Sequence, residues 1–324
     1  MKCIVALLAI FGSITGATPA HAGWDHIVVV MEENHGYSDI IGNSAANYIN
    51  NTLIPSGQLM TQSYGVTHPS QPNYLALFSG STQGVTGDPN ISGLVPPNQP
   101  QWPINAPNIG EQLLHAGLTY VGYNETMPSV GYTGDTYNNA LYAAKHNAGV
   151  NFQNGSSNTL NGNLIPANTN QTFDAYPTDF STLPSVAIVA PNQNNDMHNG
   201  GDPASIQVGD TWLQTNIDAY RVWAETHNSL LIVTWDEDEL TNANHIATIL
   251  SGAGITPGMT SDQSINHYNI LATIEDNFGL GRIAGAQGLD AVGVPEPSSL
   301  ALLAIGGLGA VVVGRRRRKS VIAD

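Results

Sequence analysis

Four consecutive acidic residues follow a strongly apolar segment in the second half of the chain. Leu230–Trp235 reads LLIVTW, a run typical of a central parallel strand covered on both faces. It is followed directly by Asp236, Glu237, Asp238 and Glu239. Carboxylates at the end of a buried strand repel one another and lose hydration unless a cation or solvent compensates. The pattern therefore favours oxygen ligands for a divalent cation, with a solvated acidic loop as the simpler alternative.

A second segment near the N-terminus has the same design. His26–Met31, HIVVVM, is followed by Glu32, Glu33 and Asn34. In an open α/β sheet, ligands collect at the carboxyl ends of the strands. Two acidic strand ends in one chain therefore favour a shared metal site over two solvated loops.

A serine precedes a predicted helix between these two segments. Residues 67–80 read THPSQPNYLALFSG, and Pro72 is well placed as the first helical residue, with Ser70 just before it. At that place the helix dipole and free N–H groups favour an anion such as a phosphate or an alkoxide. A plain capping or turn serine is the alternative.

Segments that predict strands alternate along the chain with segments that predict helices. Strands are expected at residues 26–31, 119–123, 185–190, 230–235 and 245–250, and helices at 109–116, 206–227 and 268–278. This alternation predicts an α/β fold, with a mostly parallel central sheet and helices on both faces. The Pro- and Asn-rich residues 88–108 and the Asn- and Gly-rich residues 146–171 are expected to form long surface loops that shape or cover a site.

The N-terminal 22 residues have the pattern of a signal peptide. Lys2 precedes an apolar run, and Ala20-His21-Ala22 is an A-x-A cleavage pattern. Cys3 is the only cysteine of the sequence and lies in this segment, so disulfide and thiol chemistry are not expected after cleavage. The catalytic domain is expected to span residues 23–290.

The C-terminal residues 294–320 contain a triplet, an apolar stretch and a basic block. Pro295-Glu296-Pro297 precedes the apolar residues 298–314, and an Arg-rich block follows that would stay on the cytoplasmic side of a membrane. This order resembles the PEP-CTERM sorting signal of Gram-negative bacteria. The resemblance implies export, cleavage by an exosortase-type enzyme, and display at the cell surface, in the outer envelope or in the extracellular matrix. An ordinary membrane anchor is the alternative.

Without its two ends the chain is strongly acidic. Of nine Lys and Arg residues, only Lys145, Arg221 and Arg282 lie outside the two signals, whereas nearly all of the 25 Asp and Glu remain. This balance argues against nucleic acid or an anionic membrane as a partner held by charge. Contact with a membrane is expected only through the tail, before its cleavage.

The motifs together resemble the phosphoesterase family of bacteria and fungi, which contains acid phosphatases and phospholipases C and belongs to the alkaline phosphatase superfamily. The resemblance covers roughly residues 25–280 and rests on Glu33-Asn34, HPSQPNY, PNQNNDMH at 191–198, and VTWDEDE followed by NHIATILSGAG. It implies an alkaline-phosphatase-like fold. A sulfatase of the same superfamily would need an arginine where Tyr74 stands, so the sulfatase interpretation is excluded.

The resemblance gives the motifs their roles. Ser70 corresponds to the nucleophile. Glu33 and Asn34 after the first strand, with Asp236 and Glu237 after the late strand, correspond to ligands of one divalent metal ion, and Ser70 Oγ would complete its shell. The identity of the ion is not specified by these residues.

A second metal position is implied less completely. In two-metal relatives it uses an Asp, a residue four positions later and a late His, which correspond to Asn192, Asp196 and His245. Asn192 replaces the Asp and Asp196 replaces the His, so a second ion would need a further ligand, which His198 is close enough to supply. His245 opens a predicted strand and should face the same sheet edge, with a solvent-facing loop histidine as the alternative.

The remaining histidines provide candidates for acid–base chemistry. His68 and His198 are candidates for proton transfer or phosphate contact, and His267 is either such a residue or a helix-start residue. Because Lys and Arg are scarce, cationic help for a phosphate monoester is expected from protonated histidines, which favours activity on the acid side.

The sequence therefore predicts an exported, metal-dependent phosphoric ester hydrolase that resembles an acid phosphatase. It would act on a small phosphate ester through a phosphoseryl intermediate. A phospholipase C or another phosphodiesterase is one alternative, and a non-catalytic cell-surface or matrix protein that keeps the fold is another.

Overall fold

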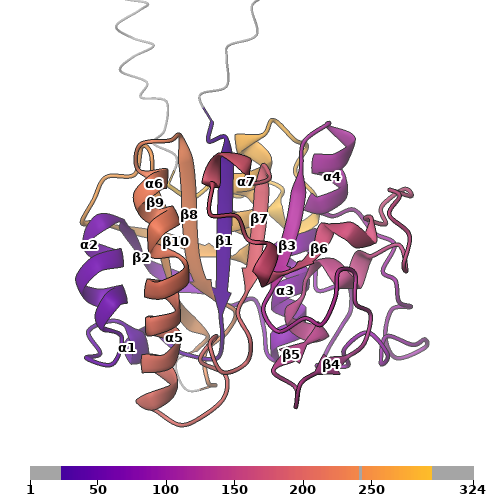
Figure 1. Cartoon of the computed structure of the whole chain (residues 1–324), viewed down its shortest axis with the longest axis horizontal. Helices are drawn as coiled ribbons and strands as arrows, with labels where there is room; N and C mark the ends of the chain where they lie inside the picture. The colour runs from indigo at the N-terminus through magenta and orange to yellow at the C-terminus, as the bar shows by residue number, and fades with distance from the viewer. Residues whose placement is uncertain (1–22, 241–242, 294–324) are drawn as a thin grey trace, which may run out of the picture.

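The computed structural model of the protein describes residues 23–240 and 243–293, which are built around an eight-stranded sheet (Figure 1). The predicted signal peptide and sorting tail lie outside the described residues. The strand order is β10-β2-β9-β8-β1-β7-β3-β6. Within the described ranges, no helix combines the length and the apolar character that crossing a membrane requires.

The centre of the sheet is parallel, as the sequence predicted. β1 (His26–Glu32) lies between β8 (Ser229–Trp235) and β7 (Val186–Ala190) and is parallel to both. β3 (Tyr120–Asn124) and β6 (Asn170–Thr172) continue the parallel arrangement beyond β7. All residues of β7 and β8 are buried, which explains why these two segments read as continuous apolar runs.

The other side of the sheet contains the two antiparallel pairings. β9 (His245–Gly252) runs antiparallel to both β8 and β2 (Gln58–Tyr64), and β10 (Met259–Asn266) pairs parallel with β2. The connection from β8 to β9 is too short for a parallel crossover, which needs a dozen or more residues. β2 and β10 were not predicted because both are rich in polar residues, and β10 alternates exposed and partly buried positions at the sheet edge.

Helices cover both faces of the sheet (Figure 1). Alternate residues of β1 belong to two apolar clusters: Ile27, Val29 and Met31 to one, and Val28 and Val30 to the other. The first cluster includes residues of α3 (Ser70–Ser79), α4 (Ile109–His115) and α7 (His267–Asn277). The second includes residues of α5 (Ala204–Asn216) and α6 (Asp218–Ala224). The expected helix at 206–227 is thus two helices, which meet at Ile217, where the backbone is distorted to φ −115°.

Short elements complete the chain. They are α1 (Tyr37–Ile40), η1 (Ile49–Leu53), α2 (Ile54–Ser56), β4 (Thr136–Tyr137), β5 (Tyr142–Ala143), η2 (Ala144–His146), η3 (Gly149–Phe152), η4 (Ala167–Thr169), η5 (Phe173–Ala175), η6 (Phe180–Thr182) and η7 (Ala284–Ala286).

The two stretches that were expected to be surface loops are anchored in the interior. Ile91 and Val150 belong to a third cluster of buried apolar residues, and Ile104 and Phe152 to the cluster around α3. The expectation of surface loops at 88–108 and 146–171 is therefore wrong for these anchored parts. The prediction was wrong because turns and a short 3-10 helix bury single apolar side chains there without any helical or strand period.

Candidate active site

The two acidic strand ends meet at one edge of the sheet, as predicted. Glu32 and Trp235 are partners in the register of β1 and β8. The backbone N–H of Asp236 donates to the carbonyl of Glu32 at 3.0 Å, and that of Asn34 donates to Asp236 Oδ1 at 3.1 Å. Sheet pairing alone therefore holds both acidic segments side by side.

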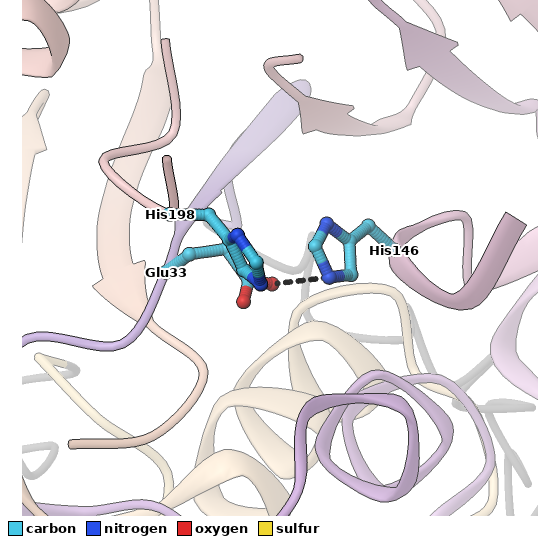
Figure 2. Close-up of side chains that lie close together, drawn as sticks. All are labelled: Glu33, His146 and His198. Carbon is cyan, nitrogen blue, oxygen red and sulfur yellow. Dashed lines mark ion pairs between the residues drawn. The ribbon is translucent and has the colours of Figure 1, made fainter. Parts of the chain in front are cut away.

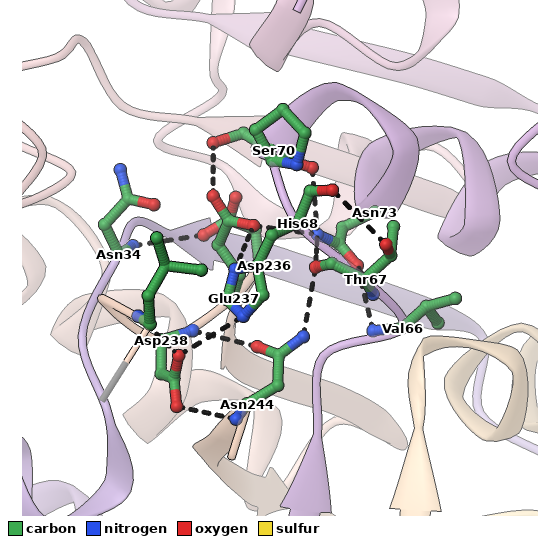
Figure 3. Close-up of polar contacts among 12 residues, drawn as sticks. Asn34, Val66, Thr67, His68, Ser70, Asn73, Asp236, Glu237, Asp238 and Asn244 are labelled. Atoms are coloured by element: carbon green, nitrogen blue, oxygen red, sulfur yellow. Dashed lines mark hydrogen bonds and ion pairs between the residues drawn. The ribbon is translucent and has the colours of Figure 1, made fainter. Parts of the chain in front are cut away.

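Ser70 lies between the two segments (Figure 3). α3 begins at Ser70, two residues earlier than Pro72 suggested, and the serine is only 2% exposed. Its Oγ lies 3.0 Å from Glu33 Oε2 and 3.2 Å from Glu237 Oε1. A hydroxyl has one proton to donate, so two carboxylates compete for one hydrogen bond, and the losing oxygen faces the serine's lone pairs.

Glu33, Asp236 and Glu237 form what we call the carboxylate cluster. Glu33 and Asp236 are fully buried and Glu237 is 5% exposed. Burial, together with Asp236 and Asp196, raises the pKa of Glu33 well above its usual range. Burial also raises the pKa of Asp236 to about 7, and burial with the charge of Asp236 raises the pKa of Glu237 to about 9. Without a counter-charge, these groups would retain protons near neutral pH.

Several buried polar atoms around the cluster have no hydrogen-bond partner among the described residues. They are Asp236 Oδ2, Asp196 Oδ2, His146 Nε2 and His267 Nδ1. Buried polar atoms in folded proteins are almost always paired, so a group of unpaired ligand atoms needs an explanation. Carboxylate oxygens and imidazole nitrogens are ligands that divalent metal ions accept. The residues present therefore fit a divalent ion.

His68 supports the cluster from the loop before α3 (Figure 3). Its Nδ1 lies 2.8 Å from Glu237 Oε2, and its Nε2 lies 3.4 Å from Asp238 Oδ1. Asp238 also accepts from the backbone of Leu240, and Glu239 accepts from the backbone of Gly36. The carboxylates of Asp238 and Glu239 thus have partners other than Ser70.

A second group of ligand atoms is formed by Glu33, His146 and His198 (Figure 2). His146 Nε2 is 3.3 Å from Glu33 Oε1, and His146 Nδ1 is 3.4 Å from Asp196 Oδ2. Glu33, His146 and His198 each offer a ligand atom within 4.8 Å of the others. Burial, with the charges of Lys145 and His198, lowers the pKa of His146 well below its usual range. A neutral imidazole can donate only one proton, so one of its nitrogens presents a lone pair to a carboxylate unless a cation or proton intervenes.

Two residues of this group were missed by the sequence analysis. Tyr74 donates its hydroxyl to Glu33 Oε1 at 2.5 Å, and its ring stacks on His146 with 5.3 Å between centroids. Tyr74 stands four residues after Ser70, a spacing that places both on one helix face and could have identified it. His146 belongs to the stretch that was expected to be a surface loop, and no periodicity marks it.

Two predicted metal ligands are not brought to Ser70. The amide of Asn192 donates to Thr126 Oγ1 at 3.1 Å and accepts from the backbone of Asn194 and Asn195, which closes a turn. His245 lies at the expected edge, but its Nε2 is 3.0 Å from the carbonyl of Thr61.

The ring of His245 is enclosed by aromatic residues. It stacks on Tyr37 with 4.5 Å between centroids and on Tyr64 with 5.1 Å. The reversal of β9 explains the geometry, because His245 pairs with Tyr64 of β2 in the sheet. Position at an edge therefore did not determine the direction of the side chain.

His267 is a helix-start residue, and it also contacts the backbone of the carboxylate cluster. It is the first residue of α7, is fully buried, and its Nε2 lies 2.7 Å from the carbonyl of Asp236. A carbonyl only accepts, so Nε2 donates and the unpaired Nδ1 carries a lone pair. Burial lowers the pKa of His267 to about 4, and burial with Lys145 lowers that of His198. Both shifts disfavour the protonated imidazoles, which differs from the expectation that protonated histidines supply the positive charge.

The chain is similar to known proteins along most of its length. A family model described as the phosphoesterase family matches residues 44–281, and a PEP-CTERM protein-sorting motif matches residues 293–318. A phosphatidylinositol-3-phosphatase of Mycobacterium tuberculosis is 41% identical over 274 residues, which cover 83% of this chain and 81% of the relative. An acid phosphatase of Aspergillus fumigatus is 28% identical, with 78% of this chain covering 54% of the fungal protein.

A solved structure supports the fold. The structure of a Vibrio parahaemolyticus protein in the alkaline phosphatase superfamily matches with a TM-score of 0.50 at 12% identity and covers 83% of this chain and 71% of the other. The predicted alkaline-phosphatase-like α/β fold is confirmed.

Proposed function

The chain belongs to the phosphoesterase family and is a phosphoric ester hydrolase, and we propose that it hydrolyses phosphate monoesters through a phosphoseryl intermediate on Ser70. The acid phosphatase and the phosphatidylinositol-3-phosphatase among its relatives both bear names of monoesterases. A small phosphate ester is therefore the proposed substrate. A phosphodiesterase of the phospholipase C type is the second candidate, because it would need the same nucleophile.

One observation carries this proposal. The buried hydroxyl of Ser70, the first residue of α3, lies 3.0 Å and 3.2 Å from carboxylates of Glu33 and Glu237. A serine that only caps a helix would bond backbone N–H groups of the first turn, whereas the cap position of α3 is Pro69 and the hydroxyl of Ser70 contacts two carboxylates. The position favours a nucleophile at a helix N-terminus, where a phosphoryl group is also stabilised.

The proposed metal site has two candidate positions, which share Glu33. Glu33, Asn34, Asp236 and Glu237 with Ser70 Oγ would hold one divalent ion. Asp196, His146 and His198 would either hold a second ion with Glu33 or act on the substrate directly. When bound, a divalent ion lowers the pKa of the serine hydroxyl and neutralises charge on the nonbridging oxygens.

In the proposed reaction, Ser70 Oγ attacks phosphorus in line with the leaving group. The Oγ–P bond forms as the P–O bond to the leaving group breaks, the serine proton passes to solvent, and the leaving oxygen takes a proton from solvent to give the alcohol. The contact of His68 with Glu237 Oε2 fixes the orientation of that carboxylate. Water then attacks the phosphoserine, which releases phosphate and restores Ser70. His198 lies beside Glu33 and is the proposed group that moves the proton of this water or contacts the phosphate.

The sorting motif supports a proposal about location. We propose that the chain is exported through an N-terminal signal peptide and processed by an exosortase-type enzyme near Pro295-Glu296-Pro297. The catalytic domain, proposed as residues 23–290, would then act at the cell surface, in the outer envelope or in the extracellular matrix of a Gram-negative bacterium.

A substrate comparison with metal control tests the proposed function. The purified protein is assayed with p-nitrophenyl phosphate, bis-p-nitrophenyl phosphate and phosphatidylcholine, after chelation and again after single divalent ions are added back. We expect hydrolysis of the monoester to exceed that of both diesters, to stop on chelation and to return with metal. Rapid acid quenching should trap phosphate on the peptide that contains Ser70. Faster hydrolysis of a diester, or activity that is indifferent to chelation, would contradict the proposal.

A further inference from the structure

Positive charge is scarce in the part of the chain that the structure describes. Its Lys and Arg residues are Lys145, Arg221 and Arg282. Arg221 pairs with Asp218 and Glu225 on α6, and Arg282 pairs with Asp276 at the end of α7. Both arginines are thus committed to carboxylates outside the candidate site, which leaves Lys145.

Lys145 lies near the helix that carries the nucleophile. It belongs to η2, which packs against α3, and its chain neighbour His146 contacts Glu33. The backbone N–H of Lys145 also donates to Asn90 Oδ1 at 2.9 Å, which fixes η2 to the loop after α3.

Asp88 links the ammonium group to the helix that carries Ser70. Lys145 Nζ lies 2.8 Å from Asp88 Oδ2, and the other carboxylate oxygen of Asp88 accepts from the backbone N–H of Gln71 at 2.8 Å. Gln71 directly follows Ser70. A single carboxylate therefore places the ammonium at the N-terminus of α3, and Nζ keeps two further N–H groups for other acceptors.

The charge of Lys145 reaches the carboxylate cluster. It lowers the pKa values of Glu33, Asp236 and Glu237 against the larger effect of burial, which raises them. Among the described Lys and Arg residues, Lys145 is the one whose charge lowers the pKa values of all three carboxylates. A phosphate monoester carries up to two negative charges on its phosphoryl group and a diester carries one, so a monoester gains more from a nearby cation.

We propose that Lys145 binds a nonbridging phosphoryl oxygen of the substrate and sets the preference for monoesters over diesters, with Asp88 as its positioning residue. This inference rests on the proposed function. Lys145 would then supply the positive charge that the sequence predicted to come from protonated histidines. Lys145 contacts the substrate, whereas Asp88 acts only through the lysine and the backbone of α3.

The test compares Lys145→Met with Arg221→Met in the holoenzyme. For Lys145→Met we expect kcat/KM for p-nitrophenyl phosphate to fall by about 10²-fold, the size of the loss when one preorganised donor is removed. The value for bis-p-nitrophenyl phosphate should change little, so the monoester-to-diester ratio should collapse. Arg221→Met removes an equal charge far from Ser70 and should leave the ratio at the wild-type value.

Binding of inorganic phosphate supplies a readout that does not depend on turnover. Its inhibition constant should rise in Lys145→Met in parallel with the loss for the monoester, and Lys145→Arg should recover part of both. Asp88→Asn should raise KM for the monoester more than it lowers kcat. If Lys145→Met unfolds at a lower temperature than the wild type, Lys145→Gln serves in its place, because an amide can still donate to Asp88.

The outcomes distinguish failure of the proposed function from failure of the proposed role of Lys145. A wild-type protein that hydrolyses neither ester would overturn the proposed function itself. A wild-type monoesterase whose Lys145 variants keep the monoester-to-diester ratio and the inhibition constant of phosphate would overturn only the role of Lys145.

Discussion

The two sides of Ser70 are built in different ways. The carboxylate cluster follows the ends of two central strands, whereas Lys145 and His146 lie on η2, a short 3-10 helix in an irregular region. Hydrogen bonds of the sheet fix the first side, and single contacts such as that of Lys145 with Asp88 fix the second. The difference teaches that rigid strands hold the carboxylates, whereas irregular backbone holds Lys145 and His146, and irregular segments can vary without loss of the fold.

The largest effect is expected from removal of the Ser70 hydroxyl, which the two sides flank. Ser70→Ala should reduce kcat by roughly 10⁴–10⁶-fold, as for other covalent nucleophiles. The fold should persist, because the change removes one hydroxyl and no apolar volume. Ser79→Ala is the matched control on the same helix, since Ser79 Oγ bonds the carbonyl of Leu75 and lies away from the site. A Ser70→Ala variant with more than about a tenth of wild-type activity would sink the proposed mechanism.

On the carboxylate side, substitutions of two nearby glutamates should have clearly different effects on metal affinity. Glu237→Gln should weaken divalent metal binding by more than the roughly 10–100-fold that loss of an outer-shell partner costs. Glu239→Gln should leave the affinity near the wild-type value, because Glu239 accepts from the backbone of Gly36. Isothermal titration of both variants with the same ion measures the contrast, and equal losses would show that the acidic run acts as a diffuse charge.

On the histidine side, substitutions of two histidines should also have clearly different effects on kcat. His146→Gln should lower kcat by about 10²-fold, the lower end of the range for groups in proton transfer or substrate contact. His245→Gln should lower it far less, because His245 stacks between Tyr37 and Tyr64 and bonds Thr61. Steady-state kinetics on p-nitrophenyl phosphate, with metal content measured in parallel, decide between them. A greater loss of metal from His245→Gln than from His146→Gln would favour the ligand set predicted from sequence.

The smallest expected effect is on stability. In the metal-free protein, burial raises the pKa of Asp236 to about 7 and of Glu237 to about 9, whereas both groups ionise near pH 4 in the unfolded chain. Between these values the folded state holds protons that the unfolded state releases, so the free energy of unfolding falls as pH rises. Thermal unfolding in chelator should show Tm decreasing from about pH 5 to about pH 9, with a shallower slope in Glu237→Gln.

Divalent metal should reverse that trend. A metal ion binds the ionised carboxylates, so its addition should raise Tm more at high pH than at low pH. A metal-induced shift in Tm that is independent of pH would mean that the carboxylate cluster does not bind the ion.

The sequence predicted the parallel centre of the fold with few errors, because β1, β7 and β8 are buried on both faces and leave continuous apolar runs. It missed β2 and β10, whose polar residues carry no such signal. The same limit applied to the site. Glu33, Asp236 and Glu237 follow long apolar runs and were named as candidates from the sequence, whereas no such run marks His146.

Sequence by itself determined the chemistry that is available: a serine at a helix start, paired acidic strand ends, very few cations and a sorting motif at residues 293–318. Tertiary structure alone decided which of these groups meet. It placed His146, Lys145 and Tyr74 around Glu33 and Ser70, and it directed Asn192 and His245 into other contacts. The physical reason is that the direction of a side chain depends on packing between segments far apart in the chain. Local patterns encode burial, whereas partners in loops are fixed only when those segments fold against each other.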